Sequence, residues 1–207
     1  MAIKILSGAT TDELTIDPIS KAARVSLYNL DGTYNGEKYT YRASTLAVFV
    51  AAVTANVPFF LIEGSASKTV IVKRIAVSGA TLTAVAYIAL DVAKFSTAAS
   101  GGTAISAPMV PMDSTFPAAT AAFVKYYTVG PTAGALVGAI ATSRTLFQST
   151  TAAAAGIPRD FVFDFGDMPE TKGIVLRGNT QGLGLIWPAA PATAVTLSVD
   201  IEWTEES

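Results

Sequence analysis

Apolar and polar residues alternate along much of this chain, and the alternation is strictest over residues 194–204. Every second side chain there is apolar, and those between are mostly threonine, serine, aspartate and glutamate. A period of two places the apolar set on one face of a strand, as is typical of a strand half buried in a sheet. The apolar positions are Val195, Leu197, Val199, Ile201 and Trp203.

Shorter segments carry the same signal or are rich in β-branched and aromatic residues, which favour strands. Phe161, Phe163 and Phe165 alternate with Val162 and Asp164. Further strands are predicted at residues 24–27, 38–42, 68–77, 82–90 and 123–129. Residue pairs that favour tight turns separate these runs, including Asp31-Gly32, Asn35-Gly36, Ser78-Gly79, Gly101-Gly102, Gly130-Pro131 and Gly178-Asn179. Many short strands joined by turns predict an all-β fold, an antiparallel sandwich or barrel.

Other structures have weaker support in the sequence. Alanine-rich residues 117–122 and 150–156 could each form a short turn of helix, but neither has the apolar stripe of an amphipathic helix. Residues 45–62 are apolar enough to suggest a membrane span, yet Asn56 and Pro58 interrupt them. Two strands joined by a turn at Ala55-Asn56 fit this segment better than a helix of the ~20 residues that a bilayer requires.

The pattern changes along the chain and suggests two parts. Residues 1–40 are more polar and richer in turn residues than the remainder, and we predict that they form an N-terminal arm or small extension. Residues 41–207 are predicted to form the β-sandwich domain.

Composition narrows the possible functions. The 207 residues are 51% hydrophobic and only 14% charged, with a net charge of −2, which excludes an intrinsically disordered chain. The balanced charge argues against binding of nucleic acid through a basic face. No cysteine and no histidine is present. Disulfides, Cys/His zinc sites, thiol nucleophiles and histidine-dependent triads are therefore excluded.

Charge is unevenly distributed along the chain. Residues 1–42 are balanced, residues 43–159 carry a net charge of +4, and residues 160–207 carry −6. Between Ile75 and Val124 only Asp91, Lys94 and Asp113 are charged. Such a segment is either core, a face that contacts another chain, or a neutral surface of small residues, and the sequence leaves these alternatives open.

Several short motifs resemble catalytic or metal sites. Residues 65–68 match the S-x-x-K pattern of serine β-lactamases, but they follow Gly64 between two predicted strands, so we expect a polar turn. Residues 164–166 spell the Asp-Phe-Gly of kinases without the other kinase motifs. The glycine-rich residues 178–184 lack the strand-to-helix context of a phosphate loop, and a tight turn is expected there.

Two residue sets are weaker candidates for ligand binding. Asp160, Asp164, Asp167 and Glu170 could offer oxygen ligands to calcium, although their spacing is not that of an EF-hand and a solvated acidic loop is the simpler interpretation. Aromatic side chains could stack on sugars, although core packing is the default role for most of them. The candidates are Tyr34, Tyr39, Tyr41, Tyr126, Tyr127 and Trp187. No catalytic, cofactor-binding or metal-binding residue is therefore assigned.

Four stretches resemble a β-sandwich family found in the virions of tailed bacteriophages. They read KTVIVKRIAVSG, SGGTAISAPMVPMDSTFPA, KGIVLRGNTQGLGLIW and LSVDIEWTEE, and the earlier DPISKAARVSLYNLDG is similar to N-terminal segments of small phage structural proteins. The combined resemblance covers residues 10–206. It implies a jelly-roll-like or immunoglobulin-like sandwich, self-association, and attachment to the capsid or the tail.

The resulting expectation is a structural protein of the virion, assembled in the host cytoplasm, and not an enzyme. We expect a capsid decoration or cement protein that forms homo-oligomers and binds the head surface. Its expected partners are the major capsid protein or tail proteins, with no nucleic acid, membrane or cofactor. The alternatives are a protein of the tail or of a head or tail fibre, a carbohydrate-binding module that recognises the host, and, least favoured, a glycan hydrolase.

Overall fold

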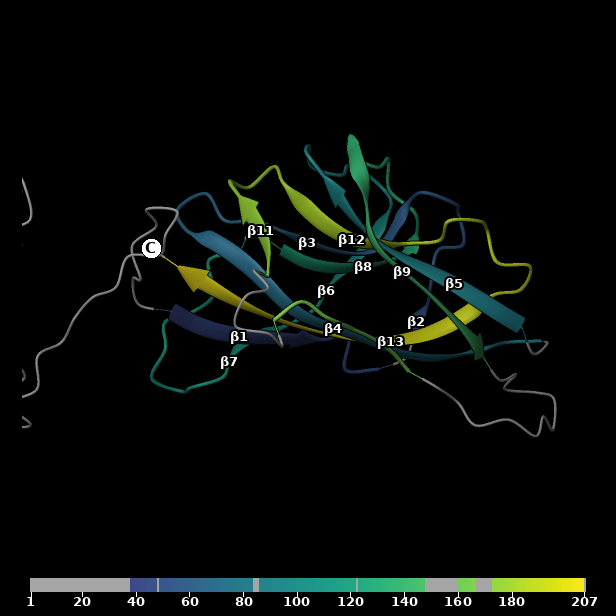
Figure 1. The fold of residues 1–207 in the computed structure, drawn as a ribbon, viewed down its shortest axis with the longest axis horizontal. Helices are drawn as coiled ribbons and strands as arrows, with labels where there is room; N and C mark the ends of the chain where they lie inside the picture. Colours follow the sequence, from purple (N-terminus) through teal and green to yellow (C-terminus); the bar gives the residue numbers. More distant parts are fainter. Residues whose placement is uncertain are drawn as a thin grey trace, which may run out of the picture. The chain divides into compact units, whose positions relative to one another are not determined.

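The computed structural model describes residues 38–47, 49–83, 86–121, 123–147, 160–166 and 173–206. These residues form two antiparallel sheets that pack face to face, as the two layers of Figure 1 show. The first sheet contains β1 (Lys38–Ser44), β2 (Phe49–Val50), β4 (Thr69–Thr81), β7 (Met109–Pro111), β10 (Phe161–Asp164), β11 (Ile174–Arg177) and β13 (Val195–Glu206). The second contains β3 (Pro58–Glu63), β5 (Ala86–Phe95), β6 (Thr103–Ser106), β8 (Phe123–Val129), β9 (Leu136–Phe147) and β12 (Gly182–Ile186). The predicted all-β sandwich is confirmed.

The order of the strands shows a jelly-roll connectivity. In the first sheet the order is β10-β4-β13-β1-β7, with β11 also beside β4 and β2 also beside β13. In the second it is β6-β8-β3-β12-β5-β9. Late strands thus lie between early ones: β13 separates β1 from β4, and β12 separates β3 from β5. Strands β1, β3, β4, β5, β9, β10–β11, β12 and β13 make up the jelly roll, and β6, β7 and β8 come from one segment between β5 and β9.

Aromatic side chains fill the space between the sheets. Trp203 of β13 is fully buried, and the Tyr41 ring stacks on it with 5.8 Å between ring centroids. On the side of the second sheet, Trp187 stacks on Phe59 at 4.4 Å, and its indole N–H donates to the carbonyl of Ala52 at 2.6 Å. Each such pair adds about 0.5–1.5 kcal/mol beyond the burial of apolar area. These large rings fill the core from the side of each sheet.

Most predicted strands are confirmed. Residues 194–204 lie in β13, where buried and half-buried residues alternate from Val195 to Glu202 as the sequence predicts. The predicted strands at 38–42, 68–77 and 123–129, and the one beginning at Phe161, correspond to β1, β4, β8 and β10. Residues 45–62 contain β2 and β3 with a turn between them, where Asn56 has a φ of 58°. In the described ranges, no helix is long and apolar enough to cross a membrane.

The predicted strand over residues 82–90 is misplaced. Strand β4 continues to Thr81 and β5 begins only at Ala86, continuing to Phe95. The backbone N–H of Leu82 donates to the carbonyl of Ala194 at 2.9 Å and continues the pairing of β4 with β13 instead. Because nearly every residue of 82–90 is apolar or threonine, the sequence does not mark where one strand ends and the next begins.

The alanine-rich residues 117–122 do not form a helix in the residues that are described there. The N–H groups of Thr120 and Ala121 donate to the Glu205 carboxylate. The predicted helical turn at 150–156, the strand at 24–27 and residues 1–37 of the predicted arm lie outside the described residues. Strand β1 begins at Lys38, within the predicted arm.

Candidate interaction surface

The Ser65 hydroxyl of the S-x-x-K motif closes the turn between β3 and β4. Ser65 is 1% exposed, and its Oγ accepts hydrogen bonds from the N–H groups of Ser67 and Lys68, each at 3.2 Å. It donates to Thr120 Oγ1 at 3.0 Å. The Lys68 ammonium lies 4.5 Å from the centre of the Tyr39 ring. The polar turn expected there is confirmed, and the hydroxyl is occupied in holding it.

A buried carboxylate organises the neighbouring loop. Glu205 is fully buried on β13, and it accepts hydrogen bonds from Thr120 N at 2.8 and 2.9 Å, from Ala121 N at 2.8 Å and from Trp203 Nε1 at 3.2 Å. The Thr120 hydroxyl also donates to it. Sequence analysis missed this group because Glu205 lies in an acidic run that reads as solvated. Its contacts fasten the loop before β8 to the end of β13.

The candidate calcium ligands are only partly described. Asp160 and Asp164 are exposed, and Asp164 Oδ1 accepts a hydrogen bond from Gly166 N at 3.0 Å. Asp167 and Glu170 lie outside the described residues. Among those that are described, no group of three or more acidic side chains is placed to hold a metal ion. The glycine-rich residues 178–184 form the expected turn, in which Gly178 has a φ of 74°, followed by β12.

The aromatic candidates for sugar stacking are mostly core residues. Tyr41, Tyr127 and Trp187 are at most 2% exposed, so their rings cannot meet a sugar, and the candidate role of Trp187 is wrong. Burial raises the pKa of Tyr41 and of Tyr127 above the ordinary value of 10.0, and the charges of Glu205 and Glu63, respectively, raise it further. Tyr39 and Tyr126 are half-buried, and Tyr34 lies outside the described residues. Among the described residues the most exposed aromatic ring is that of Tyr87, which is 79% exposed and was not a candidate.

Strand β9 forms the longest open edge of either sheet, and we call residues Leu136–Phe147 the β9 edge. It pairs with β5 on one side and with no described strand on the other. The other outer strands have two to four residues each: β2, β6, β7, β10 and β11. Arg144 is the one charged residue of the β9 edge. Long edge strands with little charge are templates for pairing with another chain.

The β9 edge has two halves of different character. In the first half the register with β5 shifts twice, between Val92 and Ala93 and between Lys94 and Phe95. The shifts leave Val137 and Ile140 as extra residues of β9, 63% and 45% exposed. In the second half, residues 141–147 pair with residues 86–92 without interruption. The edge therefore offers exposed apolar side chains followed by a regular strand.

A second exposed apolar surface lies on the segment between β5 and β9. Its side chains are Ile105, Val110, Met112 and Phe123, each 43–57% exposed. They come from β6, β7, the loop that follows β7, and β8. Strands β6 and β9 are the two opposite ends of the second sheet. The sequence left open whether the low-charge segment between Ile75 and Val124 is core, a face that contacts another chain, or a neutral surface. In the structure, β5 of this segment is largely core, whereas β6–β8 expose apolar side chains.

The outer face of the first sheet carries a polar cluster, flanked by the exposed Val110 and Val162. Arg42 of β1, Arg74 of β4 and Asp200 and Glu202 of β13 lie together there. Arg42 Nη2 is 3.5 Å from Asp200 Oδ1, and both side chains are more than a third exposed. Exposed pairs of this kind keep a face solvated and contribute little to stability. The candidate interaction surface is therefore the β9 edge together with the exposed side chains of β6–β8.

Comparisons with protein families, with curated proteins and with solved structures find no match to this chain.

Proposed function

We propose that this chain is a structural protein of a tailed-phage virion, and specifically a decoration or cement protein that binds the head surface in many copies. The observation that carries the proposal is the β9 edge, a twelve-residue strand with a single charge that has no described strand on its outer side, on an otherwise well-packed sandwich. An isolated protein normally shortens, charges or covers such an edge. A long edge strand with little charge is expected where another subunit covers that edge in an assembly.

The position of the second apolar surface supports a repeating assembly. Because β6 and β9 are opposite ends of the second sheet, each copy offers two low-charge surfaces at opposite edges. One surface can then contact a neighbouring copy while the other contacts the shell or the next copy. This arrangement suits a lattice of many subunits better than a single joint between two tail proteins.

The resemblance adds support, and the fold is compatible with it. Two of the stretches that resemble phage virion proteins form β4 and most of β13, which pair over their whole length in the middle of the first sheet. Jelly rolls occur in viral capsid domains, although the same fold also serves lectins and cupins. The proposal therefore depends on the surfaces and not on the fold.

The test is the copy number and position of the protein in purified virions. We expect quantitative mass spectrometry to find hundreds of copies per particle, and electron microscopy to place them on the outer surface of the head. A handful of copies at the tail or on a fibre would overturn the decoration role in favour of the tail alternative. Absence from purified particles would overturn the virion proposal altogether.

A further inference from the structure

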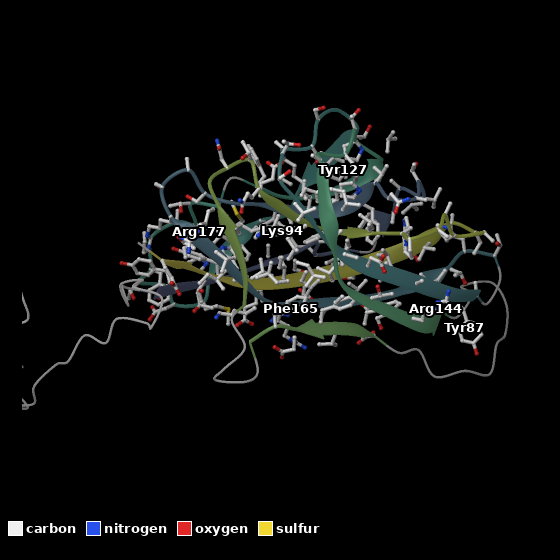
Figure 2. All side chains as sticks on the ribbon, turned by 45° about the horizontal axis from the view of Figure 1, so that its top comes forward. Tyr87, Lys94, Tyr127, Arg144, Phe165 and Arg177 are labelled. Atoms are coloured by element: carbon white, nitrogen blue, oxygen red, sulfur yellow. The ribbon has the colours of Figure 1, made fainter. Side chains whose placement is uncertain are left out.

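A groove on the outer face of the second sheet combines an exposed aromatic ring with an arginine. Its volume is about 260 Å³, and it is lined by Tyr87 and Ala89 of β5, Arg144 of β9, Trp187 and residues 189–192, which are Ala-Ala-Pro-Ala. Figure 2 shows Tyr87 and Arg144 at the same end of the molecule. Arg144 belongs to the β9 edge, but the exposed apolar side chains Val137 and Ile140 of that edge do not line the groove.

The register of β5 and β9 places the two polar side chains of the groove together. Ala89 lies opposite Arg144 and Tyr87 lies opposite Leu146, so Tyr87 and Arg144 are diagonal neighbours on one face. Diagonal neighbours of an antiparallel pair lie within reach of long side chains. The Tyr87 ring is 79% exposed, and Arg144 is exposed and forms no ion pair or hydrogen bond with another described residue.

We propose that this groove binds a saccharide that carries a carboxylate. The exposed Tyr87 ring offers a flat apolar face for the C–H groups of a sugar ring, and the alanine and proline residues offer an apolar wall. The planar guanidinium of Arg144 matches a carboxylate with two parallel hydrogen bonds. Pockets for drug-sized ligands span about 300–1,000 Å³, so a groove of 260 Å³ suits one acidic sugar residue with the rest of a glycan outside.

The electrostatics of the groove select for an anion. Arg144 is the one charged residue among those that line it, and no lining residue is acidic. The hydroxyl groups of a neutral sugar can accept only ordinary hydrogen bonds from the guanidinium, whereas a carboxylate accepts the stronger charge-assisted ones. Binding should therefore weaken as salt is added, because both the groove and its arginine are open to solvent.

A peptide is a poorer fit to the same groove. Peptides that bind to sheets usually add a strand at an edge, where main-chain groups are free to pair. The groove lies over the face of β5 and β9, where the backbone groups between the two strands are joined in their shared ladder, and the other backbone groups of β9 point away from β5 in the plane of the sheet. An extended peptide lying on that face would find no main-chain partners, whereas a sugar needs none.

Binding is tested on the purified full-length chain by isothermal titration calorimetry and saturation-transfer NMR. The probes are methyl glucuronoside and N-acetylneuraminic acid, with methyl glucoside as the neutral control and glutamyl-glutamate as the acidic peptide control. We expect saturable binding of at least one acidic sugar, with the neutral glucoside at least about tenfold weaker. Arg144→Gln should remove the preference for the acidic sugar, and Tyr87→Ala should remove binding.

Matched variants separate the site from general surface effects. Arg177→Gln removes an exposed arginine from β11, outside the groove, and should leave sugar affinity unchanged. Tyr87 and Arg144 are exposed, so their variants should melt at the wild-type temperature. The proposal is overturned if no acidic sugar binds below about 10 mM. It is equally overturned if Arg144→Gln and Arg177→Gln behave alike, or if glutamyl-glutamate binds as tightly as the sugars. The proposal does not depend on a virion role, which the particle experiment tests separately.

Discussion

Glu205 shows how one ionisable side chain can hold a loop against a sheet. Its carboxylate is buried, and it accepts hydrogen bonds from two backbone N–H groups, a hydroxyl and an indole. A buried charge is tolerated only when such bonds replace its hydration. The hydroxyl chain from Ser65 through Thr120 to Glu205 extends this anchor to the turn between β3 and β4. A motif that resembles a catalytic serine is therefore part of a structural network.

Glu205→Gln should destabilise the protein because the amide NH2 group would face backbone N–H groups that now donate to a carboxylate oxygen. We expect a loss of about 2–4 kcal/mol in the free energy of unfolding, as is usual when a buried charged hydrogen-bond network is broken. Unfolding in urea measures this loss of free energy. Glu202→Gln, on the outer face of the same strand, is the control and should change the free energy by less than about 0.5 kcal/mol. Equal effects of the two substitutions would contradict the anchoring role.

Tyr41 and Tyr127 should make the stability depend on pH in the alkaline range. Their folded-state pKa values are raised above 10.0, so the folded chain keeps these two protons when the unfolded chain has begun to lose them. The stabilisation is complete below pH 10 and is lost as the pH rises through the folded pKa values. In Tyr41→Phe/Tyr127→Phe the free energy of unfolding should fall less steeply above pH 10, by up to about 1.4 kcal/mol per pH unit for each tyrosine. If the free energy of unfolding depends on pH in the same way in the wild type and the variant, the two tyrosines do not titrate as inferred.

The β9 edge differs from the other sheet edges in length and in charge. The other outer strands are short, β7 ends in Pro111, and β10 ends in Asp164, which are common ways of preventing strand pairing. Sequence analysis could predict strands from alternation, but it could not predict which of them would be outermost. That depends on pairing between residues far apart in the chain, for example of Ala93 with both Gly184 and Ala139.

Lysine at the bulged positions should weaken association through the β9 edge. Val137→Lys/Ile140→Lys adds two positive charges at side chains that are already exposed, so the fold should be kept while contact with a second chain becomes unfavourable. Sedimentation velocity should show concentration-dependent association of the wild type and a dissociation constant at least about tenfold higher for the variant. Val162→Lys, at a 52% exposed position of the short strand β10, is the matched control and should associate like the wild type. A wild-type protein that stays monomeric at every concentration would show that the β9 edge does not mediate self-association.

At the scale of the molecule, the sequence predicted the class of fold better than its surfaces. Strict alternation, as at Val195–Trp203, reveals which face of a strand is buried, and these predictions are confirmed. Tyr87 and Trp187 could not be distinguished in this way, because both lie next to other apolar residues. Only the packing of the sheets buries Trp187 and leaves Tyr87 in the groove. The groove and the β9 edge were therefore beyond sequence reasoning.

Deleting residues 1–37 tests the predicted division of the chain into an arm and a sandwich. Both sheets pair strands that lie between Lys38 and Glu206, so we expect the shortened chain to remain folded and to melt cooperatively, as followed by circular dichroism. If the removed residues serve assembly, as we predict, the shortened chain should fail to co-sediment with virions that lack the protein, whereas the full chain should bind them. An unfolded deletion product would place these residues in the core instead.

The central positions of β12 and β13 have a consequence for how the protein reaches its native state. Each lies between two strands that end at least 87 residues earlier in the chain. Neither sheet can be completed during synthesis until these two strands leave the ribosome, and topologies dominated by such distant pairings fold slowly. Until then β1 and β4, or β3 and β5, have no partner between them, and nascent chains expose apolar strands that can aggregate. Because of this strand order, the protein should need chaperones when it is produced at a high level.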